Sequence, residues 1–301
     1  MPEVMEIRKY ADFINYLLRG ERLVDIKIIK GRYKKHKAFE SYELIKKNLP
    51  LKLTDVKTKG KFIYMEFEKN FYILNTLGLS GGWAFQKKGV TQFQMPKLLE
   101  YIDKTNVEVY LLRSMEHINV EFIFDKGKLV FFDMLSFGTL KIINDNKKLK
   151  NKLDSLGPDI MDENTNLEIF ESRIKLNSNK EKAIGVVLMN QKLISGIGNY
   201  IRADALWLSK INPFRKVKDL KENEIKNLFH NLKLITWGNY NREYAIKQNI
   251  INKTDKIPYD YKRDFFVYRE EKDIYNNPII KEELYEGSQK RFIYWVKKYQ
   301  I

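Results

Sequence analysis

The first half of the chain is dominated by strand-like runs that are joined by short glycine-containing turns. At least six such runs occur within the first ~135 residues, in the segments DIKIIKG, TDVKTKGKFIYMEFE, NFYILNTLGL, VEVYLL and NVEFIFDKGKLVFFDM. The runs separated by KG and DKGK have the pattern of antiparallel hairpins. Before them, apolar residues recur at three- and four-residue steps from Val4 to Leu18, which predicts an amphipathic helix ending near Gly20. Together these patterns favour an antiparallel sandwich or barrel with one long helix packed against it.

The second half of the chain has a different pattern. A polar stretch, NDNKKLKNKLDSLGPDIMDENTN, is the best candidate for a domain boundary, and a helical pattern begins at about Leu167. The run LKENEIKNLFHNLKLITW places Ile225, Leu228, Leu232 and Ile235 on one face. Strand-like runs return near the end of the chain, in FFVYR and QKRFIYWVKK. We therefore predict an α+β protein with a β-sandwich domain over 1–148, a linker over 149–165, a helical domain over 166–255 and a hairpin finger over 256–301.

The charge of the chain indicates a polyanionic partner. Lys and Arg number 55 against 39 Asp and Glu, which gives a net charge of +16 and favours nucleic acid over membrane. The alternative is a coding bias toward Ile, Lys and Asn that spreads lysines over the whole surface. No apolar stretch has the length of a membrane span and no apolar signal region begins the chain. We expect a soluble intracellular protein, whose compartment, whether nuclear, cytoplasmic or viral, stays open.

The chain contains no cysteine, which excludes disulfides, thiolate metal ligands and cysteine nucleophiles. The three histidines, His36, His117 and His230, are far apart and show no ligand spacing. We therefore expect neither a metal nor another cofactor.

The chain begins MPEVMEIRKY, with a proline directly behind the initiator methionine. If the methionine is removed, Pro2 carries a free secondary amine, and a helix would bring Glu3 and Glu6 to one face. An amine beside two carboxylates suits a nucleophile with its proton-transfer groups. The alternative is ordinary helix-start chemistry, because proline fits the first turn and acidic residues favour that end of the helix dipole.

A second motif, SGIGN, lies between two helical patterns. Its glycines allow a tight turn with exposed backbone amides, and Asn199 is a candidate cap for the helix that follows. A helix N-terminus behind such a turn favours a phosphate. Taken alone, the motif is weak evidence for such a site, and a plain linker between two helices is the preferred interpretation.

The longer run AIGVVLMNQKLISGIGNYIRADALWLSKINP resembles the helix-two-turn-helix signature of the Fpg/Nei family of DNA glycosylases. The resemblance implies that the turn with Gly196, Gly198 and Asn199 contacts the DNA backbone beside the lesion. Chains of that family also begin with Met-Pro-Glu and carry a second glutamate three residues on, as Pro2, Glu3 and Glu6 do here.

Further segments resemble the family in the same order along the chain. KGKFIYMEF is similar to a hairpin with a functional lysine, here Lys61, and LGLSGGW is similar to a turn that places Leu79 at a void-filling position. LGPD resembles the interdomain motif. The last segment resembles the family's C-terminal finger, whose phosphate-binding arginine falls on Arg291, with Lys290 as the neighbouring alternative.

Two departures from the family pattern favour a Nei-type preference. The finger has no cysteines, and Ile274, Tyr275, Asn276 and Asn277 stand in the region of the first ligand pair, so we expect the zincless finger of Nei-like members. The loop DMLSFG contains no arginine, so Leu79, Leu135 and Phe137 would fill the void left by an extruded base with apolar bulk alone. The stretch associated with 8-oxoguanine binding also has no clear match, and GNYNREYAIKQN stands in its place.

The resemblance implies a bifunctional DNA glycosylase and AP lyase that removes oxidised pyrimidines. Pro2 would attack the sugar, Glu3 would transfer protons, Glu6 would orient the N-terminus, and Lys61 would contact phosphate. Elimination through a Schiff base would then remove both phosphates. The expected partner is damaged or abasic DNA, double-stranded and also single-stranded, bound by a monomer. Two alternatives stay open: a lyase acting mainly on abasic or single-stranded DNA, and a non-catalytic nucleic-acid-binding protein.

Overall fold

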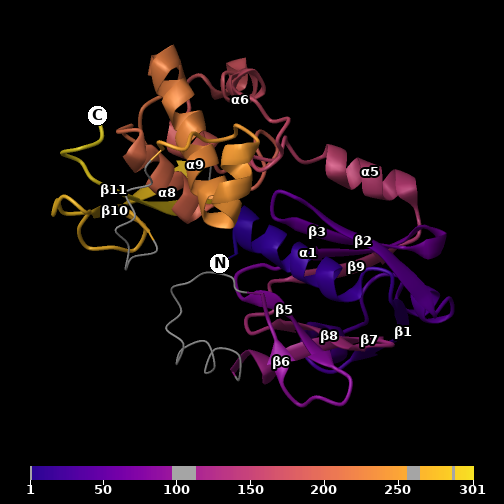
Figure 1. The fold of residues 1–301 in the computed structure, drawn as a ribbon. Coiled ribbons are helices and arrows are strands. Elements are labelled where there is room, and N and C mark those ends of the chain that lie inside the picture. The colour runs from indigo at the N-terminus through magenta and orange to yellow at the C-terminus, as the bar shows by residue number, and fades with distance from the viewer. Residues whose placement is uncertain (1, 97–112, 256–264, 287–288) are drawn as a thin grey trace. The chain divides into compact units, whose positions relative to one another are not determined.

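The computed structural model describes residues 2–96, 113–255, 265–286 and 289–301, and the chain forms two compact units (Figure 1). Pro2 and Glu6–Asp154 belong to the first unit, whereas Glu3–Met5 and Ser155–Ile301 belong to the second. The first residues of the chain are therefore shared between the two. The predicted strand VEVYLL, residues 107–112, lies outside the described residues.

The first unit is built on antiparallel strands. Its sheet has the strand order β6-β5-β8-β7-β1-β2-β3-β4-β9. The strands are β1 (Arg22–Ile28), β2 (Leu51–Lys59), β3 (Phe62–Phe67), β4 (Phe71–Thr76), β5 (Gly81–Lys87), β6 (Phe93–Gln94), β7 (Ile118–Phe124), β8 (Gly127–Asp133) and β9 (Thr139–Ile143). The helices are α1 (Val4–Leu18), α2 (Arg32–Lys35), α3 (Tyr42–Lys46), the short 3₁₀ helix η1 (Glu68–Asn70) and α5 (Asn146–Asp154).

The two halves of this sheet share one apolar core. Trp83 of β5 and Phe131 of β8 belong to the same buried cluster as Ile63 of β3 and Leu140 of β9. Tyr10 and other apolar residues of α1 complete the cluster, so the halves pack together as a sandwich with the helix against them. The predicted β2–β3 and β7–β8 hairpins are confirmed.

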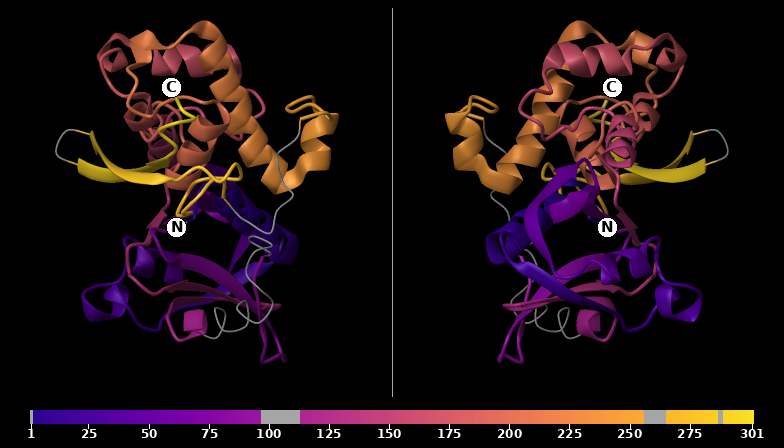
Figure 2. Two further views of the ribbon diagram at one scale, coloured as in Figure 1. Left: turned by 90° about the vertical axis from the view of Figure 1, so that its left-hand side faces the viewer. Right: turned by 90° about the vertical axis from the view of Figure 1, so that its right-hand side faces the viewer.

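The second unit is helical and ends in a two-stranded hairpin. Its elements are α6 (Leu167–Ile174), η2 (Asn177–Asn179), α7 (Ile184–Val187), α8 (Asn199–Leu208), η3 (Val217–Asp219), α9 (Glu222–Lys247), β10 (Ile280–Glu286) and β11 (Gln289–Trp295). The predicted apolar face of α9 is buried, with Ile225, Leu228 and Leu232 fully inaccessible. The hairpin extends from the helices as a twisted ribbon (Figure 2). The mixed α+β fold predicted from the sequence is thus confirmed.

Two segments differ from their sequence patterns. FFVYR, residues 265–269, is not a strand, because the carboxylate of Asp204 in α8 accepts hydrogen bonds from the backbone N–H groups of Val267 and Tyr268 at 3.0 and 3.3 Å. The polar stretch after β9 contains α5, which buries Leu149 and receives a hydrogen bond from Lys59 Nζ to the Leu153 carbonyl at 2.7 Å. Among the described residues, no helix is both long and apolar enough to cross a membrane.

Candidate nucleic-acid-processing site

The N-terminus of α8 is closed by a carboxylate from the start of the chain. Glu3 is fully buried, and its two carboxylate oxygens accept hydrogen bonds from Tyr200 N at 3.0 Å and Ile201 N at 3.4 Å. The positive end of the helix dipole favours a negative group at this position. Glu3 therefore fixes the beginning of the chain to the SGIGN turn.

The two glycines of this turn are required because Val4 and Glu3 lie directly against them. Gly196 has φ +105°, a region that other residues rarely adopt, and a Cβ there would lie 2.9 Å from Cβ of Val4. A Cβ at Gly198 would lie 2.1 Å from the Glu3 carboxylate carbon. The turn can therefore approach residues 3 and 4 only because both positions lack a side chain.

Asn199 is not the cap of α8, contrary to the sequence interpretation. Gly198 is the N-cap residue and Asn199 is the first helical residue. Glu3, far away in sequence, supplies the acceptor that the helix start needs, so the Asn199 side chain is released for another role. Its Oδ1 accepts a hydrogen bond from Arg202 Nη2 at 3.4 Å.

Arg202 joins the turn to the hairpin and was missed by sequence reasoning. Its guanidinium is fully buried and donates to the carbonyls of Gly185 at 2.9 Å and Phe292 at 2.7 Å. Burial lowers the pKa of Arg202 to about 10, while the charge of Glu3 opposes that shift, so the side chain stays cationic at neutral pH. The only signal available in the sequence was a basic residue one turn into the helix expected after the SGIGN turn.

Lys290 and Arg291, the two candidate phosphate-binding residues of the finger, have different surroundings on β11. Lys290 is exposed and forms an ion pair with Glu283, which raises the pKa of Lys290. Arg291 is half-buried, and its charge contributes to lowering the pKa of Arg202. The second unit thus gathers Glu3, the SGIGN turn, Arg202 and Arg291 in one region.

The other predicted catalytic residues belong to the first unit. Pro2 is half-buried and lies two positions before Val4, the first residue of α1. Glu6 is 5% exposed in the first turn of α1. Lys61 is half-buried and follows Gly60, whose φ of 56° forms the tight β2–β3 turn.

Three exposed apolar side chains lie on two loops of the first unit that are hydrogen-bonded to each other. Leu79, Leu135 and Phe137 are 47%, 56% and 59% exposed. Ser80 Oγ donates to Asp133 Oδ1 at 2.6 Å and accepts from Leu135 N at 2.8 Å. The two loops are therefore held together, and the predicted void-filling residues come from one surface.

The carboxylate of Asp133 also holds the far end of its own loop, because its second oxygen accepts a hydrogen bond from Gly138 N at 2.6 Å. Ser80 and Asp133 were missed as positioning residues, although both stand inside the motifs LGLSGGW and DMLSFG.

The finger is organised by a carboxylate rather than by a metal-ligand set. Asp273 accepts hydrogen bonds from Tyr275 N at 3.0 Å, Asn277 N at 2.8 Å and Trp207 Nε1 at 3.2 Å. Structural zinc sites use cysteine and histidine ligands, but the chain has no cysteine. No group of three or more potential ligands gathers within the described residues. The described residues of the finger therefore do not suit zinc.

The β-sandwich followed by a helical unit with a tight glycine turn and a hairpin is the architecture expected for the helix-two-turn-helix DNA glycosylases. Residues 1–140 match the family model described as the formamidopyrimidine-DNA glycosylase N-terminal domain. Residues 156–237 match the model described as the formamidopyrimidine-DNA glycosylase H2TH domain. The chain belongs to the Fpg/Nei family, as expected from its motifs, and is a DNA glycosylase of base excision repair.

The chain is similar to proteins named formamidopyrimidine-DNA glycosylase and to a protein named endonuclease 8. Formamidopyrimidine-DNA glycosylase of Ligilactobacillus salivarius is 24% identical over 77% of this chain and 75% of its own length. Endonuclease 8 of Shigella dysenteriae is 25% identical over 83% of each. The crystal structure of the Lactococcus lactis formamidopyrimidine-DNA glycosylase, non-covalently bound to AP-site DNA, has the same fold, with a TM-score of 0.73, 20% identity and 99% of each chain covered.

Proposed function

We propose that this chain removes oxidised pyrimidines from DNA and then cleaves the abasic strand, with the amine of Pro2 as nucleophile. The observation that carries the proposal is the pair of hydrogen bonds from Tyr200 N and Ile201 N to Glu3. They fix the residue next to Pro2 at the helix start that the family motif assigns to DNA contact. A nucleophile on a free chain end needs such an anchor to reach one sugar atom reproducibly.

In the proposed reaction the damaged nucleotide is first extruded from the duplex, at a cost of about a few kcal/mol. Contacts of Lys61, Asn199 and Arg291 with phosphates would offset that cost. The SGIGN turn would meet the same backbone through Asn199, because Gly196 and Gly198 are buried and the Gly196 N–H donates to Gln191 Oε1 at 2.9 Å. Leu79, Leu135 and Phe137 would occupy the space that the base has left, since their loops are locked together and their side chains are exposed.

The Pro2 nitrogen then forms a bond to C1′, and the base leaves with the electrons of the glycosidic bond. Glu3 protonates the ring oxygen, so the sugar opens to a cationic iminium, and Glu6 orients the N-terminus. Loss of a C2′ proton expels the 3′ phosphate by β-elimination, and a further proton loss expels the 5′ phosphate by δ-elimination. Water finally hydrolyses the iminium and regenerates the amine.

The preference for pyrimidines is supported by the apolar loop. The segment Asp133–Gly138 carries no arginine that could pair with the orphaned partner base. An enzyme without that donor discriminates weakly between opposite bases. The same observation favours the second candidate function, an AP lyase that acts mainly on abasic sites and single strands.

One comparison of substrates separates these functions. Oligonucleotides with an oxidised pyrimidine, 8-oxoguanine or an abasic site are cleaved as duplexes and as single strands, and the end groups are identified. We expect a monomeric enzyme that excises the pyrimidine faster than 8-oxoguanine and leaves phosphates at both ends of the gap. Cleavage of abasic DNA alone would replace the glycosylase proposal by the lyase, and faster excision of 8-oxoguanine would refute the pyrimidine preference.

A further inference from the structure

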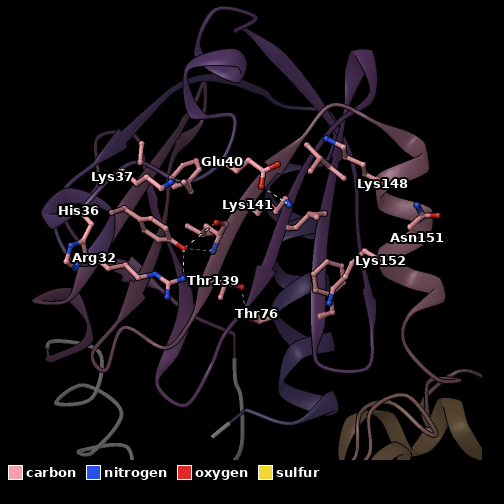
Figure 3. Close-up of a pocket in the computed structure, with 17 residues that line it drawn as sticks. Arg32, His36, Lys37, Glu40, Thr76, Thr139, Lys141, Lys148, Asn151 and Lys152 are labelled. Atoms are coloured by element: carbon pink, nitrogen blue, oxygen red, sulfur yellow. Dashed lines mark hydrogen bonds and ion pairs between the residues drawn. The ribbon is translucent and has the colours of Figure 1, made fainter.

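The first unit contains a pocket that the proposed chemistry does not use. It lies between the α2–α3 segment on one side, α5 on the other, and strands β3, β4 and β9 beneath (Figure 3). Its volume is about 770 Å³, which is within the usual range of small-molecule sites. All residues that line it belong to the first unit.

The floor of the pocket is apolar and held in place by hydrogen bonds. It is formed by buried side chains of the strands and the α2–α3 segment: Phe39, Phe62, Leu74, Leu140 and Ile143. The hydroxyl of Tyr33 accepts from Leu140 N at 2.6 Å, and the Glu40 carbonyl accepts from Ile142 N at 3.1 Å. The α2–α3 wall is therefore fixed to β9, and the pocket is preformed.

The rim of the pocket is strongly cationic. Five Lys and Arg residues line it, and they are Arg32, Lys37, Lys141, Lys148 and Lys152, whereas Glu40 is the single carboxylate of the lining. Glu40 is already paired with Lys141 at 2.7 Å. Figure 3 shows that Arg32 and Lys37 face Lys148 and Lys152 across the strands. The side chains from both walls thus concentrate positive charge above an apolar floor.

We propose that this pocket binds a nucleotide, either free or as part of a single DNA strand. A phosphate would lie among the rim cations, and a planar base would cover the apolar floor. A bare inorganic anion would leave that floor in contact with water. The inference goes beyond the proposed function and does not depend on Pro2 or Glu3.

One end of the pocket lies close in sequence to the loops that carry the exposed apolar residues. Thr76 and Thr139 line one end of it, and their hydroxyls are hydrogen-bonded to each other at 2.6 Å. Thr76 precedes Leu79 by three residues and Thr139 follows Phe137 by two. The pocket therefore begins where the loops with the exposed apolar residues end.

Photocrosslinking of the full chain tests the proposal. Azidoadenosine triphosphate is the free-nucleotide probe and a single-stranded oligonucleotide with thiothymidine is the strand probe, and labelled peptides are mapped by mass spectrometry. The variant K148E/K152E reverses two exposed cations of the pocket, whereas K87E/K88E makes the same change of charge at two exposed lysines outside it. Thermal unfolding confirms that both variants fold.

We expect labels on peptides from residues 31–46 or 139–154, reduced about tenfold in K148E/K152E and little changed in K87E/K88E. Labelling by the strand probe alone would assign the pocket to nucleic acid, and labelling by the nucleotide probe alone would assign it to a free nucleotide. Labels outside both segments, equal labelling of the two variants, or competition by inorganic phosphate as strong as by AMP would overturn the proposal.

Discussion

Glu3 serves the structure and, in the proposed mechanism, the chemistry. Its carboxylate replaces a local cap at the start of α8, and the proposed reaction requires the same carboxylate to transfer a proton. These two roles depend on different properties, because hydrogen-bond acceptance needs only an oxygen, whereas proton transfer needs an ionisable group. They can therefore be separated by one substitution.

Glu3→Gln keeps an oxygen that can accept from Tyr200 N but removes the charge and the exchangeable proton. We expect a loss of about 1 kcal/mol in the free energy of unfolding, from the weaker hydrogen bonds and helix-dipole interaction. Base excision should fall by about 10²–10⁴-fold. Urea unfolding and single-turnover excision measure the two effects. Excision at the normal rate in a folded variant would remove Glu3 from the proton-transfer role.

The residues of the turn illustrate what a sequence can indicate about a site. The spacing of Gly196, Gly198 and Asn199 marked the turn, because tight turns need residues without a Cβ. The capping role was assigned to the wrong residue, since Glu3 is 197 positions from its donor Tyr200. No local pattern encodes such a contact, and the same is true of Arg202 and its bond to Phe292.

At the scale of elements, α8 organises the segment that follows the helices. Asp204 is buried, and burial raises its pKa to about 7 although the N–H groups of Val267, Phe266 and Tyr268 favour the charged form. The sequence FFVYR indicated a strand because aromatic and β-branched residues dominate it. The buried carboxylate is a tertiary interaction that overrides this preference.

This raised pKa predicts a pH-dependent stability. Because the folded state binds the Asp204 proton more tightly than the unfolded chain, its contribution is present below pH ~4 and is lost as the pH rises toward ~7. Asp204→Asn retains the acceptor oxygen but cannot ionise. We expect urea unfolding to show a smaller fall in stability between about pH 4 and about pH 8 for the variant than for the parent. Parallel pH profiles would show that Asp204 does not titrate in this range.

The C-terminal hairpin is a second element, and contacts of Asp273 and Trp207 stabilise the turn before it. Asp273 holds the turn before β10, and the indole of Trp207 that it binds is stacked on Tyr299 with ring centroids 5.3 Å apart. The absence of cysteine predicted a finger without zinc, but it gave no indication that one aspartate would connect the turn to α8.

Asp273→Ala removes the acceptor from the buried indole of Trp207 and from several part-buried donors at once. We expect a loss of about 3 kcal/mol in the free energy of unfolding, with weaker DNA binding through the finger. The exposed Glu271, which lies two residues earlier, provides the matched control Glu271→Ala, which should change stability little. A chelator should leave the melting temperature of the parent unchanged. Strong destabilisation by the chelator would contradict the carboxylate-based account of the finger.

At the scale of the whole molecule, the net charge of +16 predicts DNA binding that weakens steeply with salt. Individual cations contribute differently, because an ion-paired lysine releases few counterions when it meets a phosphate. Lys290 is paired with Glu283, whereas Arg291 lies beside Arg202 in the site.

Arg291→Ala and Lys290→Ala remove the same charge from neighbouring positions. We expect Arg291→Ala to weaken binding to an abasic duplex and to reduce the slope of log K against log salt by about 1. Lys290→Ala should leave the slope close to that of the parent. Fluorescence anisotropy over a salt series distinguishes the two, and the reverse order would assign the phosphate contact to Lys290.

If the chain acts through the amine of Pro2, borohydride traps that amine on an opened abasic sugar. The protein is incubated with an abasic oligonucleotide and borohydride, and the adduct is digested and sequenced by mass spectrometry. We expect a reduced covalent bond between the sugar and Pro2 as the first residue of the mature chain. An adduct on a lysine, or no adduct from a protein that has a verified Pro2 terminus and binds the DNA tightly, would contradict it.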